Sequence, residues 1–199
     1  MKLTLSTPQA IRYACKNFHY TGSVPSVQYG FNVYNSAGEW CGVICFGGSA
    51  TPRIGMPFDL CQGEILELVR VALNGKQHKT SQCIAAAMRE LHRRNPLVKI
   101  VVSYASRDEN HKGIIYQATN WIYLGEIKGE STKSIIINGK NTHKRTVGAR
   151  YGTTNLEYLR KHIDPEAKIC ESKGRYKYIY CFDKKLRKKW QKAALPYPK

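Results

Sequence analysis

The sequence predicts a mixed α/β fold in which helices flank a central sheet, and three observations carry this prediction. Residues 97–105 form a near-continuous β-branched run, typical of a strand buried on both faces. Residues 28–47 contain two apolar segments around a four-residue turn, which is the pattern of a β-hairpin. Residues 80–95 place apolar side chains at helical spacing between two strand segments. With no internal repeat and no low-complexity linker, we expect a single domain over residues 1–199.

The first helix is expected to begin at Thr7, whose hydroxyl can cap it, with Pro8 at the first helical position. The hairpin that follows turns at residues 35–38. In its second strand, Cys41 and Cys45 lie an even number of residues apart, which predicts that both face the core on the same side of the sheet.

A long strand is expected over residues 64–74, and its alternation predicts Val69 on one face and Arg70 on the other. Arg70 interrupts an otherwise apolar strand, so if it is buried it needs an anionic partner. That partner is either a substrate group or cofactor phosphate, or else Glu64 or Glu67 in a structural ion pair.

Further along the chain, helices and strands are expected to alternate. The predicted elements are, in order, helix 80–95, strand 97–105, helix 113–121, strands 123–128 and 134–137, helix 154–163, strand 175–182 and a basic final helix. Thr80 or Ser81 is expected to cap the first of these helices and Asp183 the last. Asn138 and Gly139 are a strong signal for a tight hairpin turn.

The charge of the chain points to a polyanionic partner. The net charge is +18; residues 1–127 carry 13 basic and 8 acidic residues (+5), and residues 128–199 carry 19 and 6 (+13). This asymmetry favours a nucleic acid contacted mainly through residues 128–199, although a solvated basic surface would have the same composition. No apolar run is long enough to span a membrane, and the N-terminus lacks a signal-peptide core.

Basic residues of the last two predicted elements are the candidates for DNA contact. Arg175 and Lys177 alternate with tyrosines in the strand 175–182, as cations and aromatic side chains do on nucleic-acid surfaces. The alternative is that these tyrosines pack on the sheet. The candidates in the final helix are Lys184, Lys185, Lys188 and Lys189.

The cysteines are expected to be reduced thiols of a cytosolic protein. There are seven, an odd number, and no two are spaced as C-x-x-C. This spacing does not favour a zinc site.

Polar side chains follow directly on the buried strand 97–105, where ligands bind in open α/β sheets. Ser103 and Tyr104 lie at the end of this strand, and Asp108 follows four residues later. Asp108 is a candidate for a general base or a group that orients a substrate amine, and the alternative is a turn or capping aspartate.

The order of the predicted elements resembles the core of GNAT-type N-acetyltransferases. This resemblance implies that the helix starting at Lys79-Thr80-Ser81 presents its amides to the pyrophosphate of coenzyme A. Tyr116 matches a tyrosine that serves as proton donor in such enzymes, and its alternative is a core position. The GNAT fingerprint has two glycines before this helix, whereas the present chain has only Gly75.

The whole chain also resembles the phage Mom family, the DNA adenine-modification proteins of Mu-like phages. Five segments carry this resemblance: Phe18-His19-Tyr20, Leu68-Val69-Arg70, Ser103-Tyr104-Ala105 with Asp108, the segment from Gly113 to Gly125, and Leu195-Pro196-Tyr197-Pro198-Lys199. The family converts the exocyclic amine of adenine in phage DNA to its methylcarbamoyl form, which protects the DNA from host restriction enzymes. The resemblance therefore implies double-stranded DNA as partner and the host cytoplasm as location.

These resemblances and the residue types together define the candidate site. Tyr104 and Tyr116 are expected to stack or donate hydrogen bonds in the pocket, with Ser103 beside them. Arg70, Thr80 and Ser81 are expected to hold a cofactor or donor.

A metal is a further candidate partner for the site. His19, Tyr20 and Asp108 offer a mixed oxygen and nitrogen ligand set suited to iron, although their spacing does not require a metal.

The family product limits the donor chemistry. A methylcarbamoyl group is attached through its methylene carbon and carries an extra amide nitrogen, so acetyl transfer from coenzyme A is not sufficient. A different small-molecule donor, or a further step, is needed. Two other functions fit the sequence: an acyltransferase acting on an RNA-associated amine, and a basic DNA-binding protein without catalysis.

Overall fold

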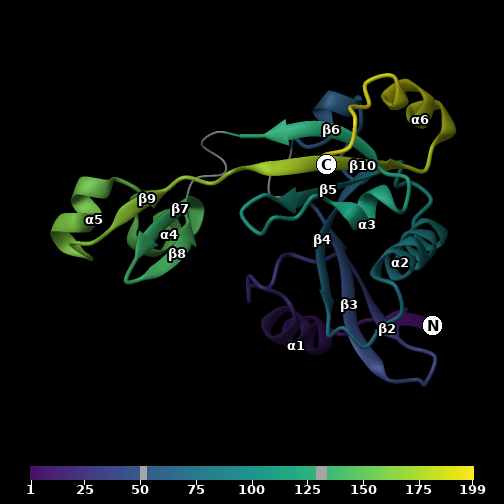
Figure 1. Ribbon diagram of the computed structural model, residues 1–199, viewed down its shortest axis with the longest axis horizontal. Coiled ribbons are helices and arrows are strands. Elements are labelled where there is room, and N and C mark those ends of the chain that lie inside the picture. Colours follow the sequence, from purple (N-terminus) through teal and green to yellow (C-terminus); the bar gives the residue numbers. More distant parts are fainter. Residues whose placement is uncertain (50–52, 129–133) are drawn as a thin grey trace. The chain divides into compact units, whose positions relative to one another are not determined.

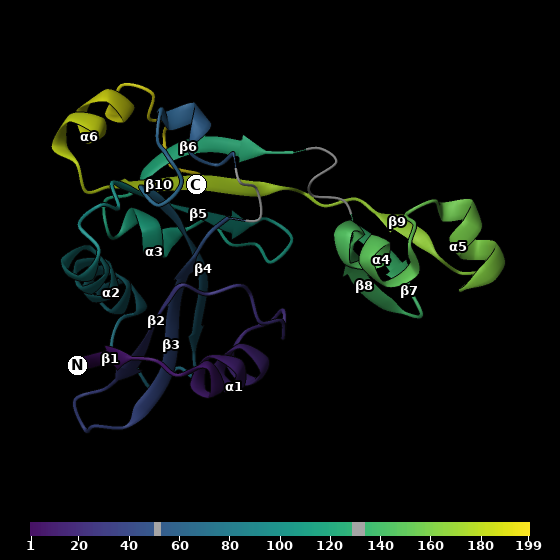
Figure 2. The same ribbon diagram turned by 180° about the vertical axis from the view of Figure 1, so that it is seen from behind.

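The computed structural model describes residues 1–49, 53–128 and 134–199, which form two sheets and their helices (Figure 1 and Figure 2). The seven-stranded sheet has the order β1-β2-β3-β4-β5-β10-β6, and the three-stranded sheet has the order β8-β7-β9. The strands of the larger sheet are β1 (Lys2–Leu5), β2 (Tyr29–Tyr34), β3 (Trp40–Gly47), β4 (Ile65–Leu73), β5 (Ile100–Ser106), β10 (Arg175–Cys181) and β6 (Ile122–Ile127). Those of the smaller sheet are β8 (Lys140–His143), β7 (Ser134–Ile137) and β9 (Lys168–Cys170).

Helices connect the strands. They are α1 (Pro8–Phe18), η1 (Met56–Phe58), α2 (Thr80–Arg94), α3 (Ile114–Gln117), α4 (Lys144–Tyr151), α5 (Leu156–His162) and α6 (Lys184–Gln191). The predicted mixed central sheet flanked by helices, with a basic C-terminal strand and helix, is confirmed. Among the described residues, no helix is long and apolar enough to cross a bilayer.

The chain packs as two compact units. The core unit comprises residues 1–103, 113–124 and 178–198, and the inserted unit comprises residues 104–112, 125–177 and Lys199. The inserted unit has its own apolar core, made of Ile135, Ile137, Val147, Leu159 and Ala167. The prediction of one domain over residues 1–199 stays a prediction, since one domain can contain two such units.

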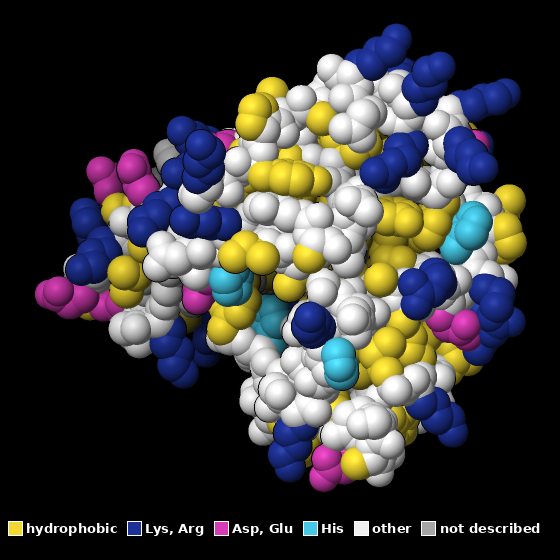
Figure 3. Space-filling view, turned by 45° about the vertical axis from the view of Figure 1, so that its right-hand side comes forward, with side chains coloured by type: hydrophobic (Ala, Val, Ile, Leu, Met, Phe, Trp, Pro, Cys, Tyr) yellow, Lys and Arg dark blue, Asp and Glu magenta, His cyan; other side chains and the backbone are white. Residues whose placement is uncertain are grey.

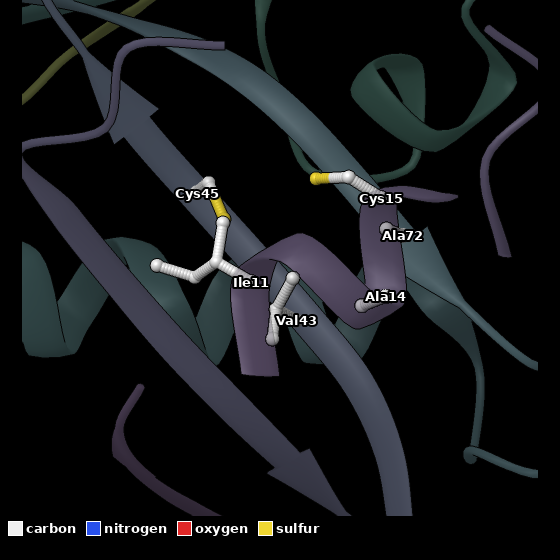
Figure 4. Packing of buried hydrophobic residues seen from close by; sticks show 6 residues of the cluster. All are labelled: Ile11, Ala14, Cys15, Val43, Cys45 and Ala72. Atoms are coloured by element: carbon white, nitrogen blue, oxygen red, sulfur yellow. The ribbon is translucent and has the colours of Figure 1, made fainter. Parts of the chain in front are cut away.

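Helix α1 packs on one face of the core-unit sheet. Thr7 caps it by accepting a hydrogen bond from the Ala10 amide at 3.2 Å, as the sequence predicts. Its buried residues meet β3 and β4 in a cluster of Ile11, Ala14, Cys15, Val43, Cys45 and Ala72 (Figure 4). Helix α2 covers the opposite face (Figure 1), so the sheet is apolar on both sides.

The parallel pairing of β4 with β5 is short. It joins Ile65 to Ile100, Leu66 to Val101 and Glu67 to Val102, and the register ends there. Both strands continue, β4 to Leu73 and β5 to Ser106. Beyond these three pairs, the residues of β4 and β5 are no longer ladder partners.

Two β-bulges change which side chains share a face of the sheet, compared with simple alternation. The pairing of β3 with β4 shifts between Cys45–Arg70 and Phe46–Leu68, so Val69 is an extra residue. Val69 packs against the α1 cluster, and Arg70 acts electrostatically on Cys45 of the same cluster. The two neighbours thus share a face, and the prediction of opposite faces is wrong.

A second bulge lies beside Cys41, where Val33 pairs with Gly42 but Tyr34 pairs with Trp40. Cys41 acts electrostatically on Cys83 of α2, whereas Cys45 belongs to the α1 cluster. The two cysteines therefore lie on different faces, contrary to the sequence prediction. All seven cysteines are free thiols, as predicted.

Several other predicted boundaries need correction. Lys79, not Thr80 or Ser81, is the N-cap residue of α2, and its side chain makes no capping hydrogen bond. Helix α3 is a single turn rather than a helix over 113–121. Helix α5 covers Leu156–His162 instead of 154–163, and Asn155 caps it by accepting from the Tyr158 amide. The elements β8, α4 and β9 are not predicted by the sequence patterns.

Other local predictions are confirmed. The hairpin β2–β3 forms as expected, and Asn138 and Gly139 turn between β7 and β8 with positive φ angles. Asp183 caps α6 by accepting from the Leu186 amide at 2.7 Å.

The start of α3 predicts a sensitive position. Gly113 has a φ of +75°, and an added Cβ would lie 2.5 Å from a ring carbon of Tyr178, which is fully buried. Gly113→Ala should lower the free energy of unfolding by about 1–3 kcal/mol more than Gly38→Ala, measured by urea denaturation. Gly38 is the matched control, because its φ is +81° and no atom lies within 4 Å of an added Cβ. Equal losses for the two variants would contradict this packing.

Candidate active site

A buried pair of hydroxyls lies where β4 and β5 separate. Ser103 of β5 is 1 % exposed, and its Oγ lies 2.8 Å from the Tyr116 hydroxyl of α3. The same Oγ lies 3.2 Å from the Leu68 carbonyl oxygen of β4. Ser103 has one hydroxyl hydrogen and therefore donates to only one of these acceptors at a time. The structure thus brings together two predicted site residues, Ser103 and Tyr116.

Burial sets the protonation state of Tyr116. Loss of hydration raises the pKa of the Tyr116 phenol to about 12, although its bond with Ser103 acts in the opposite direction. The charges of Tyr20 and Glu67 also raise this pKa, which places both groups within electrostatic reach of the phenol. Tyr116 is therefore a neutral hydrogen-bonding group at physiological pH.

The ring of Tyr116 is fixed by other aromatic side chains. Its centroid lies 5.0 Å from that of Tyr178 and 5.1 Å from that of Trp121. Tyr178 is fully buried, and Tyr180 packs 5.8 Å from Trp121. These two tyrosines of β10 pack on the sheet, as the alternative to nucleic-acid stacking proposed.

Arg70 ties the loop over residues 19–25 to β4. Its Nε donates to the Ser23 carbonyl oxygen at 3.2 Å and its Nη2 to the Ser23 hydroxyl at 2.8 Å. Its Nη1 donates to the Val69 carbonyl oxygen at 2.9 Å. Glu64 pairs with Lys99 instead. The guanidinium therefore acts on a loop, and the prediction that Arg70 binds a cofactor stays a prediction.

His19 and Tyr20 form a stack at the start of this loop. Their ring centroids are 4.3 Å apart at an interplanar angle of 29°. The Thr21 amide donates to His19 Nδ1 at 3.2 Å, so this nitrogen is engaged within the loop. Among the residues that the structure describes, no three His, Cys, Asp or Glu side chains gather as a metal site. The iron prediction for His19, Tyr20 and Asp108 stays a prediction, and no step below passes through a metal.

Asp108 anchors a turn within the inserted unit. It accepts hydrogen bonds from the Ser172 hydroxyl and, at 2.8 Å, from the Lys173 amide. The Ser172 oxygen in turn accepts from the Gly174 amide at 3.0 Å. This geometry favours the turn-stabilising alternative over the catalytic one.

Other predicted contact residues also lie in the inserted unit. The Arg175 guanidinium lies 5.1 Å from the centre of the Tyr104 ring, a cation–π contact. Burial lowers the pKa of Lys177, so this side chain is less suited to a phosphate than an exposed lysine.

The N-terminus of α2 is open to an anionic group, because no side chain caps its first amides. The Thr80 hydroxyl accepts from the Gln77 side chain at 3.1 Å, and Lys76 and Lys79 are exposed nearby in sequence. A donor site at Thr80 and Ser81 stays a prediction.

Helix α6 presents a basic surface. An open depression of about 440 Å³ is lined by Lys184, Arg187, Lys188, Gln191 and Lys192. Lys189 pairs with Asp59 at 3.0 Å, and the side chains of Lys184 and Lys185 are exposed. Figure 3 shows lysine and arginine side chains gathered at the top of this face, where α6 lies.

Sequence reasoning did not identify Glu67 as a site residue. It considered this carboxylate only as an ion-pair partner for Arg70, since its position in an alternating strand gave no other signal. In the structure, Glu67 belongs to the last residue pair of β4 with β5, opposite Val102, and acts electrostatically on Tyr116.

The chain resembles known proteins over most of its length. The family model described as "Mom protein family" matches residues 4–199. The methylcarbamoylase Mom of Escherichia phage Mu is 27 % identical over 172 residues, which cover 82 % of this chain and 69 % of that protein.

Two acetyltransferases are among the solved structures with a similar backbone fold. A Bacillus subtilis acetyltransferase in complex with CoA matches at 8 % identity and a TM-score of 0.48, over 92 % of this chain and 99 % of its own. A spermidine N-acetyltransferase from Vibrio cholerae matches at 8 % identity and a TM-score of 0.49, over 91 % and 95 %. No residue's role follows from these values.

The buried phenol predicts a distinct alkaline titration. The folded-state pKa of Tyr116 lies above the ordinary value of 10, so its contribution to stability is complete below pH 10 and is lost as the pH rises to about 12. Tyr116→Phe should remove one late phenolate step from the ultraviolet titration of the folded protein. Tyr13→Phe, at an exposed position, should leave that late step in place. An unchanged late step in Tyr116→Phe would show that Tyr116 is not in the buried environment described.

Proposed function

This chain belongs to the Mom protein family, and from that premise we propose that it is a transferase that modifies adenine in DNA. The product we propose is the methylcarbamoyl derivative of the exocyclic amine, and its role is to protect viral DNA from host restriction. The observation that carries this proposal is the family match over residues 4–199, which spans every candidate site residue. The name of the phage Mu relative supports the same chemistry.

Tyr116 and Ser103 would act as a switchable hydroxyl pair. When Ser103 donates to the Leu68 carbonyl oxygen, Tyr116 can donate to Ser103. When Ser103 donates to Tyr116 instead, the phenol proton is available to another acceptor. Because the pKa of Tyr116 is about 12, this proton is present at neutral pH. Tyr116 would thus stabilise negative charge on a reacting group as a proton or hydrogen-bond donor.

Glu67 would accept the proton that the amine loses. An amine that forms a new bond to carbon must give up a proton, and a carboxylate near the reacting atoms can take it. Glu67 lies within electrostatic reach of Tyr116 and is only partly buried. Glu67 and Tyr116 would therefore place a proton acceptor and a proton donor together at the end of the β4–β5 pairing.

The donor of the methylcarbamoyl group would bind at the N-terminus of α2, the helix that follows β4 in the chain. A coenzyme A-type donor would supply an activated acyl carbon, and its phosphates suit the uncapped first turn of α2 at Thr80 and Ser81. Acetyl transfer alone does not yield a methylcarbamoyl group, so we propose no step from this donor to the product.

DNA would be held mainly through charge. Affinity for a duplex rests on lysine and arginine side chains that neutralise phosphates. The exposed basic surface of α6 and the basic residues of the inserted unit, among them Arg175, are candidates for these contacts.

The modification itself predicts a new nucleoside. DNA from cells that express the chain should contain an adenosine species heavier by the methylcarbamoyl group, detected by mass spectrometry after digestion to nucleosides. Glu67→Gln and Tyr116→Phe should each lower its yield by about 10²-fold or more, as loss of an acid or base does. Both changes keep the size of the side chain, and circular dichroism should show an unchanged fold.

Asp108→Ala and Ser172→Ala serve as a matched pair of controls. If Asp108 is an anchor, both variants should lose only a modest share of yield, because each removes the hydrogen bond between Asp108 and Ser172. Unmodified DNA with altered RNA would instead support an acyltransferase acting on RNA, and no altered nucleoside at all would support a non-catalytic DNA-binding protein.

The basic surface of α6 predicts a measurable salt dependence. Replacing Lys184, Lys185 and Lys188 by alanine should weaken duplex binding and reduce the slope of log affinity against log salt by up to about three. Lys189 is left intact because it pairs with Asp59. A control that replaces the exposed Lys2, Arg12 and Lys16 removes equal charge from β1 and α1. Equal effects of the two triple variants would show that α6 makes no specific phosphate contacts.

A further inference from the structure

We propose that Tyr20, held in its stack on His19, is the face on which the extruded adenine of the DNA substrate stacks. This inference rests on the proposed function. It assigns Tyr20 a substrate-binding role through its ring, and Arg70 a positioning role through the loop over residues 19–25.

The chemistry of the substrate creates the need for such a face. The exocyclic amine of adenine lies inside the duplex, so an enzyme that acts on it must take the base out of the helix. An extruded base loses its stacking neighbours, and an aromatic side chain that replaces one of them strengthens binding by about tenfold or more.

The stack of His19 and Tyr20 is already formed. Its centroid separation of 4.3 Å and tilt of 29° leave the Tyr20 side chain 57 % exposed while one side is supported by the imidazole. The imidazole is itself held, since Nδ1 accepts from the Thr21 amide at 3.2 Å and lies 2.9 Å from the Thr21 hydroxyl. Little side-chain freedom therefore remains to be lost when a third ring is added.

The loop that carries the stack is held beside β4, the strand whose Leu68 carbonyl oxygen contacts Ser103. The contribution of Tyr20 to the raised pKa of Tyr116 agrees with a position near that phenol. Arg70 fixes the loop to β4 through both the carbonyl and the hydroxyl of Ser23. This anchoring explains why a charged residue interrupts the apolar strand: the bulge at Val69 turns Arg70 toward the loop that carries the stack.

Tyr13 provides a matched comparison in the same unit. Its side chain is 56 % exposed, nearly as much as that of Tyr20, but it packs edge-on against Phe18 on α1. It also packs against Trp40 of β3, with the ring centroids 5.9 Å apart. An effect of aromatic surface in general would appear at both tyrosines, whereas stacking at the site would appear at Tyr20 alone.

The test compares the full chain and its variants on two duplexes that differ at one position, an adenine that is either paired or bulged. The wild-type protein should bind the bulged duplex about tenfold more tightly, because the cost of extrusion is already met. Tyr20→Leu and Tyr20→Ala should lose this preference, keep the affinity for the paired duplex, and lower the yield of modified adenine about tenfold. Tyr20→Phe should retain the preference for the bulged duplex, because it keeps the ring, and Tyr13→Leu should behave as the wild type.

Each of the following outcomes would overturn one part of this proposal. Retained preference and yield in Tyr20→Leu would overturn the stacking role. Loss in Tyr20→Phe equal to that in Tyr20→Leu would show that the phenol oxygen acts, as a metal ligand would, and not the ring. Abolition of the preference by added coenzyme A would show that the face takes the adenine of a donor. Absence of modified adenine with the wild-type chain would overturn the proposed function itself, before any variant is compared.

Discussion

The site depends on one constraint, the short parallel pairing between β4 and β5. Pairing ends at Glu67 and Val102, and both strands continue beyond it. Backbone groups and side chains past this point must find other partners. Ser103 does so by contacting the Leu68 carbonyl oxygen and the Tyr116 hydroxyl, so one buried side chain links β4, β5 and α3. The end of the pairing is thereby marked by two hydroxyl groups that can hold or move a proton.

The bulge at Val69 is the second backbone feature on which the site depends. A ladder without the extra residue would direct Arg70 to the other face of β4. With the bulge, Arg70 reaches Ser23 and holds the loop that carries His19 and Tyr20. β4 therefore positions side chains of the site in two ways, through the end of its pairing with β5 and through the bulge in its pairing with β3. Both are features of the backbone, and they determine where the side chains of the site lie.

Local signals predicted much of the fold, and long-range contacts account for what they missed. Thr7 and Asp183 were identified as caps because a cap acts within three residues. The sequence of the strand contains no signal for the bulge at Val69. Simple alternation therefore predicts opposite faces for Val69 and Arg70, whereas they share one. The partner of Asp108 is 64 residues away, and a carboxylate after a strand looks the same whether it anchors a turn or acts as a base. Helix α4 was missed because its segment, KRTVGARY, lacks an apolar stripe.

The most direct test of the account is to find where a target adenine meets the protein. A duplex with one photoreactive adenine analogue would be crosslinked to the full chain, and the attached peptides would be identified by mass spectrometry. The account predicts crosslinks to residues 19–25 or to α3, the segments that carry Tyr20 and Tyr116. Crosslinks confined to residues 134–177 of the inserted unit would contradict it.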